Sequence, residues 1–411
     1  MTDRIESLAG DFPLGSKWTL AAPALFLVIL PFAHTVALRL TCLGLTALTA
    51  LAVAWRTGWP RPAVLWPLAA WIVLAFASVS WSVDPDFSLK EAKSEAGYTT
   101  IAFLSFLVLA QAPAAWEWFR RALLVGLAAM TLYALLSFWQ HGEWLKVGWV
   151  SGVGYAGTYL SLMFAILLAH APQARGPWSR IGLAMLVALL MAAGYATTNR
   201  AFWVALGATL VTFAALAGRP PSRGALAIRL GMLTAALAVI GVGFLAAIRQ
   251  RHLLHGQADQ VAALFSSDIR WRMWTHTLER IAEQPWTGYG FGRGILAEEF
   301  RTGFEPIATH THNLILDMGL GLGVPGALLL VAILTTLAFE FWRLYRSGVP
   351  QAREMGLLGL LLLVALLSKN VTDNLFARDP ALLFWSLAGI ALGRGMTFGC
   401  SRGAGASPRR V

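Results

Sequence analysis

Cysteine and charged residues are both scarce in this sequence. Of its 411 residues only Cys42 and Cys400 are cysteines, and 13% are charged. Cys42 lies in a predicted membrane helix and Cys400 in the C-terminal tail, so the sequence predicts neither a disulfide nor a cysteine-based metal site. Hydrophobic residues make up 57% of the chain. This composition excludes a soluble core and indicates a protein that crosses the membrane several times.

Apolar runs that are long enough for membrane helices recur along the chain. Their periodicity is helical rather than alternating, which favours membrane helices over the strands of a barrel. Twelve helices are predicted, over residues 18–35, 37–55, 62–81, 98–113, 118–139, 153–170, 180–197, 201–217, 229–248, 323–343, 355–371 and 380–397. The first run lacks a convincing cleavage site, so we expect it to remain as an anchor.

Four regions follow from this pattern. Residues 1–248 hold predicted helices one to nine, residues 249–311 form a long polar loop, residues 312–399 hold the last three helices, and residues 400–411 form a basic tail that we expect to be disordered. The predicted fold class is an all-α polytopic membrane protein with one large loop.

The net charge of +11 is explained by membrane topology rather than by nucleic-acid binding. Arginines gather in alternate connections between the predicted helices, and most of the other connections are poor in lysine and arginine or balance them with acids. Because positively charged connections stay in the cytoplasm, both termini are predicted to be cytoplasmic, and the loop at 249–311 lies on the outer face. Long loops cross the membrane largely regardless of charge, so the arginines of this loop do not overturn the assignment.

An amphipathic helix is predicted within the large loop, starting near Asp268. Its apolar residues recur at spacings of three and four, at Trp271, Trp274, Leu278 and Ile281. Pro285 is expected to stop the helix. The glycine-rich segment 288–294 that follows is predicted to be an irregular loop. A nucleotide site is the alternative, but no strand precedes this segment and no Gly-Lys-Ser/Thr sequence follows it.

Two arginines of the outer face are candidate ligands for an anion. Arg200 lies in a sharp turn between two apolar runs, where the alternative is an anchor at the membrane surface. Arg270 shares one face of the amphipathic helix with Trp274, four residues further on, and Trp274 can dock that face against the membrane helices. For Arg270 the alternative is a solvated helix face, and Arg272 points to a different face.

His312 and Asn313 stand where the polar loop meets an apolar run. His310 and His312 together suggest a metal, yet no set of His, Asp or Glu at ligand spacing completes such a site nearby. A helix cap or a packing residue is a second interpretation. The third is a catalyst, because a histidine with its ordinary pKa of roughly 6.5 can take a proton from a hydroxyl near neutral pH.

Asp373 follows the eleventh predicted helix on the same face, where it could orient a histidine, pair with an arginine or only shape a polar loop. The predicted topology brings four segments to this face, and they carry Arg200, Arg270, His312 and Asp373. Two guanidinium groups can neutralise a departing diphosphate while a histidine activates an acceptor hydroxyl. This combination predicts an enzyme that acts on a membrane-anchored diphosphate.

These residues resemble the O-antigen ligase and polymerase superfamily of bacterial envelope glycosyltransferases. His312-Asn313 followed by Gly323-Val324-Pro325-Gly326 is similar to the family's His with a later Gly-x-x-Gly. The sequence from Arg270 to Trp274 and then Pro285 to Gly290 resembles Arg-x-x-x-Trp and Pro-x-x-Gly-x-Gly. Asn199-Arg200-Ala201 resembles a short Ser/Asn-Arg-Gly/Ala signature. The resemblance covers about residues 150–380.

The resemblance implies an architecture of the glycosyltransferase C type and an O-antigen ligase of the bacterial inner membrane, with its site on the periplasmic face. Such an enzyme transfers glycan, with inversion and without metal or cofactor, from undecaprenyl diphosphate to a sugar hydroxyl of lipid A-core, in lipopolysaccharide biosynthesis. By this carry-over His312 is the general base. Arg200 and Arg270 hold the diphosphate. Substrate binding is also expected of Asp373, Asn313 and Trp274.

Three alternatives stay open. An O-antigen polymerase or a protein O-oligosaccharyltransferase of the same superfamily would use the same donor chemistry and differ in its acceptor. A twelve-helix transporter fits the number of predicted spans, although transporters place polar groups near the bilayer midplane and these candidates lie at outer helix ends. A non-catalytic assembly partner would explain the helices but not the converging arginines and histidine.

Overall fold

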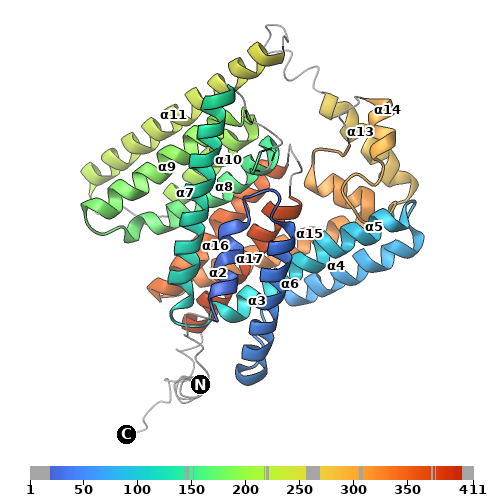
Figure 1. Cartoon of the computed structure of the whole chain (residues 1–411), viewed down its shortest axis with the longest axis horizontal. Coiled ribbons are helices and arrows are strands. Elements are labelled where there is room, and N and C mark those ends of the chain that lie inside the picture. The colour runs from blue at the N-terminus through green and yellow to red at the C-terminus, as the bar shows by residue number, and fades with distance from the viewer. Residues whose placement is uncertain are drawn as a thin grey trace.

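The computed structural model describes residues 19–142, 144, 148–150, 152–216, 218, 222–255, 269–304, 309–371, 374 and 376–399. Within these residues the chain is built from helices and has no strand, apart from one isolated antiparallel bridge between Phe32 and Val150 (Figure 1). The predicted all-α fold class is confirmed.

Eight helices of the described residues are long and apolar enough to cross a membrane. They are α3 (Val36–Thr57), α7 (Ala115–His141), α8 (Val153–His170), α9 (Pro177–Ala196), α11 (Arg223–His255), α15 (Leu314–Arg346), α16 (Pro350–Asn370) and α17 (Arg378–Gly399). Unpaired backbone groups are costly in lipid, and a helix pairs them within one segment. The prediction of a multi-pass membrane protein is therefore confirmed.

The other four predicted membrane segments fall on shorter helices, α2 (Ala21–Ile29), α4 (Leu65–Ala77), α6 (Tyr98–Leu109) and α10 (Arg200–Leu216). α4 continues into η1 (Ser78–Trp81), and α6 follows α5 (Pro85–Glu91) and the π-helical η2 (Ala92–Gly97). Each predicted segment coincides with a helix, while the count of twelve spans stays a prediction. One boundary was wrong: α15 begins at Leu314 rather than at residue 323, because Asn313 caps it there.

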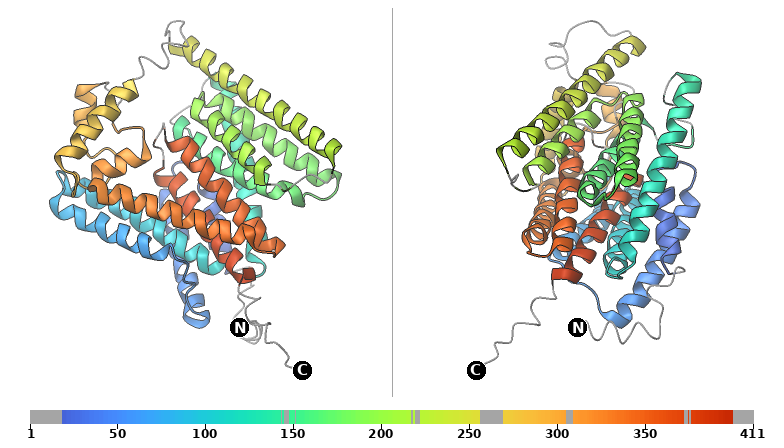
Figure 2. Two further views of the ribbon diagram at one scale, coloured as in Figure 1. Left: turned by 180° about the vertical axis from the view of Figure 1, so that it is seen from behind. Right: turned by 90° about the vertical axis from the view of Figure 1, so that its left-hand side faces the viewer.

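α8, α16 and α17 are the most buried of the eight membrane-length helices, and α11 is the most exposed (Figure 2). Glycines let the inner helices touch. A Cβ atom added to Gly389 of α17 would lie 2.4 Å from the carbonyl oxygen of Phe103 in α6, and one added to Gly393 would lie 2.1 Å from that of Leu107. Close backbone approach at small residues is how membrane helices associate, so α6 and α17 form the centre of the bundle.

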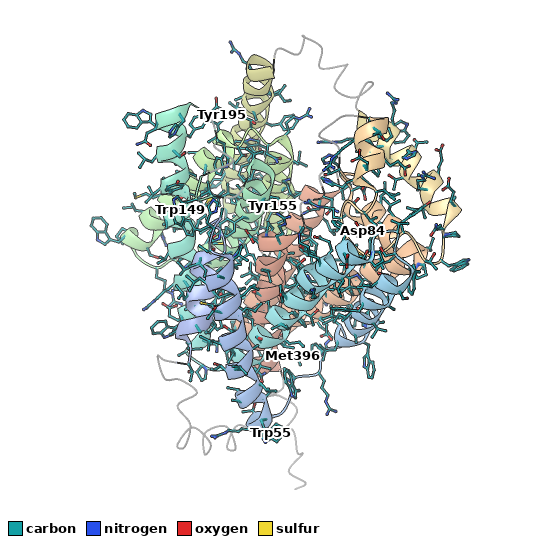
Figure 3. The ribbon with its side chains drawn as sticks, turned by 45° about the vertical axis from the view of Figure 1, so that its right-hand side comes forward. Trp55, Asp84, Trp149, Tyr155, Tyr195 and Met396 are labelled. Carbon is teal, nitrogen blue, oxygen red and sulfur yellow. The ribbon has the colours of Figure 1, made fainter. Side chains whose placement is uncertain are left out.

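The inner helices have two ends. Figure 3 shows Tyr155, near the start of α8, and Met396, near the end of α17, toward opposite ends. We call these the Tyr155 end and the Met396 end. α8 and α17 run between them in the same direction, because α17 starts where α8 starts and ends where α8 ends. The candidate site lies at the Tyr155 end.

The predicted loop helix is present as α13 (Ile269–Glu283), which ends before Pro285 as expected. Its predicted apolar face was wrong in part, because Trp271 is 71% and Leu278 56% exposed. The buried side chains are Met273 and Thr277. Met273 packs in a small core with residues of the glycine-rich loop, α14 (Ala297–Gly303) and α15, and this partner rather than the apolar spacing selects the inward face.

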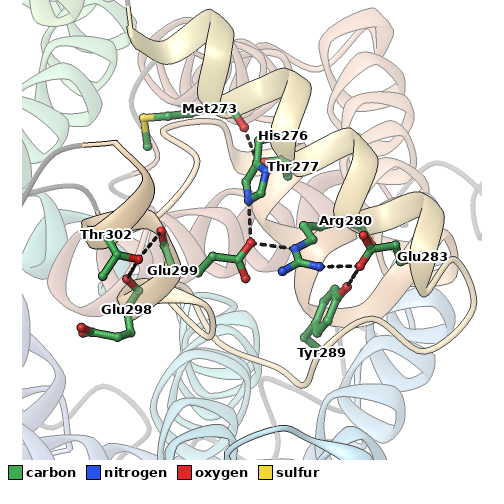
Figure 4. A network of polar contacts seen from close by, with 9 residues as sticks. All are labelled: Met273, His276, Thr277, Arg280, Glu283, Tyr289, Glu298, Glu299 and Thr302. Atoms are coloured by element: carbon green, nitrogen blue, oxygen red, sulfur yellow. Dashed lines mark hydrogen bonds and ion pairs between the residues drawn. The ribbon is translucent and has the colours of Figure 1, made fainter.

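Ion pairs fasten α13 to α14 and to the glycine-rich loop (Figure 4). Arg280 Nε donates to Glu299 Oε1 at 2.6 Å, and Arg280 Nη1 donates to Glu283 Oε2 at 2.6 Å. Glu283 Oε2 also accepts from the Tyr289 hydroxyl at 2.9 Å, and His276 Nε2 lies 2.6 Å from Glu299 Oε1. The Arg280 guanidinium holds the pKa of Glu299 below its usual range. At least this arginine of the loop is therefore structural.

The glycine-rich loop fills a break in α15. Gly323 has a left-handed φ of 67°, and Val324 N–H donates to Pro285 O at 2.7 Å instead of to Leu320 O four residues back. Tyr289 N–H takes Leu320 O at 3.0 Å. Pro325 has no N–H to offer Gly321 O, and Gly290 N–H takes that oxygen at 2.9 Å.

Candidate functional site

The histidine segment forms the turn that begins α15. Asn313 is the N-cap: its Oδ1 accepts from Ile315 N–H and Leu316 N–H, both at 3.0 Å. Asn is a favoured cap because its short side chain reaches the first free amides of a helix. Its Nδ2 donates to Val371 O at 3.0 Å, which ties the start of α15 to the end of α16.

His312 sits in this turn with a left-handed φ of 57°. This backbone conformation is unfavourable for a residue with a Cβ, by roughly 1–2 kcal/mol, so neighbouring bonds must hold it. The Thr311 hydroxyl oxygen accepts from Asn313 N–H at 3.1 Å and donates to Asn313 O at 3.0 Å, which closes the turn around His312. Strained backbone of this kind recurs at functional sites.

The two histidines differ in accessibility. His310 is buried, its Nδ1 lies 3.0 Å from Thr309 Oγ1, and its ring centroid is 4.2 Å from that of His312. His312 is half-buried. A substrate hydroxyl can therefore reach His312 more easily, with His310 packed behind it.

A polar chain leads from this turn across four elements. Asp317 of α15 accepts from Thr311 N–H at 3.0 Å through Oδ1 and from the Asn374 side chain through Oδ2. Asn374 O accepts from Arg293 Nη1 at 2.6 Å, and Arg293 Nη2 donates to the Tyr155 hydroxyl of α8. The Arg293 guanidinium also lies over the Tyr155 ring, 5.5 Å from its centroid. The turn around His312 is thus connected to the glycine-rich loop and to α8.

Arg293 and Asp317 face a narrow cavity of about 60 Å³. Glu95 of η2 lies in its wall, with both carboxylate oxygens 2.9 Å from Arg378 N. Desolvation raises the pKa of Glu95 to about 7, and nearby Glu91 adds to that shift. Aromatic rings make up much of the remaining wall, from Trp71, Phe291, Phe376 and Trp385. A cavity of this size has room for water but not for a sugar.

α13 docks directly on the histidine segment. Trp274 Nε1 donates to Thr311 O at 2.8 Å, one residue before His312. Arg270 lies one helical turn before Trp274 and is half-buried, so the same side of α13 carries it toward this end of the bundle. Arg272 points elsewhere, with its guanidinium 5.9 Å from the centre of the Phe304 ring.

Arg200 is the first residue of α10, and the turn before it packs at the same end. Thr198 has a φ of 52° in this turn. A Cβ atom added to Gly157 of α8 would lie 3.5 Å from both the Asn199 amide and the Lys369 side chain of α16. The segment carrying Arg200 therefore meets the start of α8 and the end of α16. The end of α16 also accepts the hydrogen bond from Asn313.

Asp373, the remaining predicted ligand, lies outside the described residues; Asn374 beside it is the partner of Asp317. The described residues hold no group of three His, Cys, Asp or Glu side chains that could bind a metal. Sequence reasoning missed Arg293, Tyr155 and Asp317. A carboxylate inside an apolar run was a usable signal for Asp317, since ionisable groups in membrane helices usually have functional roles. Tyr155 gave no comparable signal.

Comparison with known proteins supports the resemblance. Residues 184–331 match the O-antigen ligase family, and no curated protein matches the chain significantly. The matched region contains Arg200, Arg270 and His312, together with the glycine-rich loop and the break in α15. Over residues 184–331 the chain is therefore similar to the O-antigen ligase family, whose members are glycosyltransferase-like enzymes.

Proposed function

We propose that this protein is an O-antigen ligase that transfers glycan from undecaprenyl diphosphate to a sugar hydroxyl of lipid A-core. The observation that carries the proposal is the docking of α13 on the histidine segment through Trp274 and Thr311. It joins the helix with Arg270 to the turn with His312. The family match supports the same class of reaction.

In this proposal the acceptor hydroxyl gives its proton to His312 and attacks the anomeric carbon of the donor sugar. The new glycosidic bond forms as the bond from that carbon to the diphosphate oxygen breaks, on the opposite face, so the configuration inverts. Arg200 and Arg270 carry the charge of the departing undecaprenyl diphosphate, because guanidinium groups pair with phosphate oxygens through two parallel hydrogen bonds. No metal or cofactor is required for this step.

Asn313 and Trp274 serve binding indirectly in this scheme. Asn313 fixes the start of α15, and Trp274 fixes α13 against the turn. Asp373 is proposed as a further substrate contact next to Asn374. The membrane location that fits the proposal is the bacterial inner membrane, with both termini in the cytoplasm and the Tyr155 end in the periplasm, where the lipid-linked donor and lipid A-core meet.

Reconstitution with two acceptors tests the proposal. Purified protein is given undecaprenyl-diphosphate glycan with and without lipid A-core, and products are separated by mass. We expect glycan on lipid A-core, and His312→Ala should lower its rate by roughly 10²–10⁴-fold, the usual contribution of a general base. His141→Ala, an exposed histidine at the end of α7, is the control. A product that is only lengthened lipid-linked glycan would assign the protein as a polymerase instead.

A further inference from the structure

A second polar cavity lies at the Met396 end, away from the candidate site. It has a volume of about 320 Å³ and sits where α7 and α16 begin and where α8 and α17 end. Charged and amide side chains make up most of its wall. The lining residues are Trp116, Glu117, Arg120, His170, Gln173, Gln351, Glu354, Met355 and Arg394. His170 is about 22 Å along α8 from Tyr155, at 1.5 Å per residue. The two sites are therefore separate.

On one side of this cavity, Arg120, Glu117 and His170 use most of their hydrogen-bonding groups on one another and on neighbouring side chains. Arg120 Nε donates to Glu117 Oε2 at 3.0 Å, and Arg120 Nη1 lies 2.8 Å from His170 Nε2. A guanidinium can only donate, so His170 Nε2 accepts and carries no proton in this arrangement. Glu117 Oε1 also accepts from Arg121 Nε at 2.7 Å. This cluster has little capacity left for a ligand.

Arg394 and Glu354, on the other side of the cavity, can each form further hydrogen bonds. Arg394 makes one long hydrogen bond, from Nη1 to Ala112 O at 3.5 Å, and its guanidinium stacks 4.8 Å from the centre of the Phe398 ring. Gln173 of the same wall hydrogen-bonds to the Glu354 carboxylate, but Glu354 Oε1 is buried and accepts no hydrogen bond from the described residues. Among those residues Arg394 and Glu354 also form no ion pair with each other, although their charges interact. The Arg394 guanidinium and the Glu354 carboxylate thus face the same cavity.

We propose that this cavity binds a phosphate ester that carries a primary ammonium group, the chemistry of a phosphatidylethanolamine headgroup. The phosphate pairs with Arg394, and the ammonium donates to Glu354 Oε1. An anion without an ammonium leaves the Glu354 oxygen unsatisfied in its buried position, which costs free energy. A quaternary ammonium cannot donate to it at all. The cavity therefore selects a zwitterion with N–H groups.

The position of the cavity indicates that such a ligand comes from the membrane. It opens at the ends of four membrane-length helices, the level at which phospholipid headgroups lie. Trp118 of α7 and Trp178 of α9 are exposed near the same helix ends, and tryptophan is enriched where membrane meets water. A bound headgroup would bridge α16 and α17, the helices that carry Glu354 and Arg394.

The test uses full-length protein, stripped of lipid in detergent and titrated while its unfolding temperature is followed. Short-chain phosphatidylethanolamine, phosphatidylcholine and phosphatidylglycerol are compared, with soluble phosphoethanolamine and inorganic phosphate as further arms. We expect phosphatidylethanolamine to bind about tenfold more tightly than phosphatidylcholine, the effect of one charge-assisted hydrogen bond. Soluble phosphoethanolamine should compete with the lipid, and inorganic phosphate should not. Equal shifts with all three lipids would overturn the proposal.

Substitutions then assign the two contacts. Glu354→Gln should abolish the preference for ethanolamine over choline, and Arg394→Gln should weaken binding of both lipids. Arg175→Gln removes an exposed arginine near the same end and should change neither affinity. If Arg394→Gln does not fold, the comparison of lipids on the wild-type protein still decides. Unchanged ethanolamine preference in folded Glu354→Gln would contradict the assignment.

Discussion

Exchanging the partners Asp317 and Asn374 tests whether their contact holds the turn around His312. Both oxygens of Asp317 accept hydrogen bonds, one from Thr311 N–H and one from the Asn374 side chain. In Asp317→Asn the new amide can still accept from Thr311, but its NH2 group then faces the NH2 group of Asn374. Losing a hydrogen bond to a charged group costs roughly 1.5–3 kcal/mol.

This loss should appear in two measurements. The unfolding temperature should fall, because both residues are buried and the two donors are left facing each other. If the whole lost free energy raises the activation barrier by displacing His312, the transfer rate falls roughly 10- to 150-fold, at about 1.4 kcal/mol per factor of ten. Asn374→Asp alone should also destabilise the protein, since it sets two carboxylates against each other.

The double variant Asp317→Asn with Asn374→Asp restores one donor opposite one acceptor, and it should recover most of the stability and rate lost in either single variant. Asp86→Asn removes an exposed carboxylate from α5 and serves as the control, with no change expected. A double variant that is as damaged as the two single changes added together would refute the pairing, because independent sites add and paired ones do not.

Three further predictions concern pH, packing and metal. The pKa of Glu95 is raised from 4.5 to about 7, so the wild type loses stability as pH rises from 4.5 through 7, by at most about 3 kcal/mol. Glu95→Gln should remove that loss, and its advantage in an unfolding titration should vanish below pH 4.5. Trp274→Phe removes the donor to Thr311 O and should lower the transfer rate roughly 2- to 10-fold. Trp271→Phe changes an exposed position and should leave the rate unchanged. Equal rates in the two variants would show that the hydrogen bond from Trp274 to Thr311 does not affect catalysis. Excess EDTA should leave transfer unchanged, and a loss restored by added metal would argue for a metal at His310 and His312.

Local features of the fold could be predicted from the sequence. Hydropathy located a helix at every expected membrane segment, because a lipid-facing helix must be apolar along its whole length. Pro285 ended α13 as expected, and the cap considered at His312-Asn313 is made by Asn313. These features depend on neighbours within a few residues along the chain.

The rest depended on which segments meet, and one sequence does not contain that information. Trp271 and Leu278 fitted the predicted helical stripe and Met273 did not, yet Met273 is the buried side chain, because α14 and the loop pack against it. Arg293 belongs to the site through contacts with Asn374 and Tyr155, which are distant in sequence. The roles of Arg200, Arg270 and Asp373 stay predictions.

The break in α15 at Gly323 has a consequence for the order in which the protein is made. Leu320 O and Gly321 O accept from the amides of Tyr289 and Gly290, and Val324 N–H donates to Pro285 O. Residues 285–290 leave the ribosome first, so these three hydrogen bonds cannot form until residues 320–324 have been synthesised. A chain truncated before residue 320 should therefore show rapid amide hydrogen exchange at Tyr289 and Gly290, which the complete chain protects.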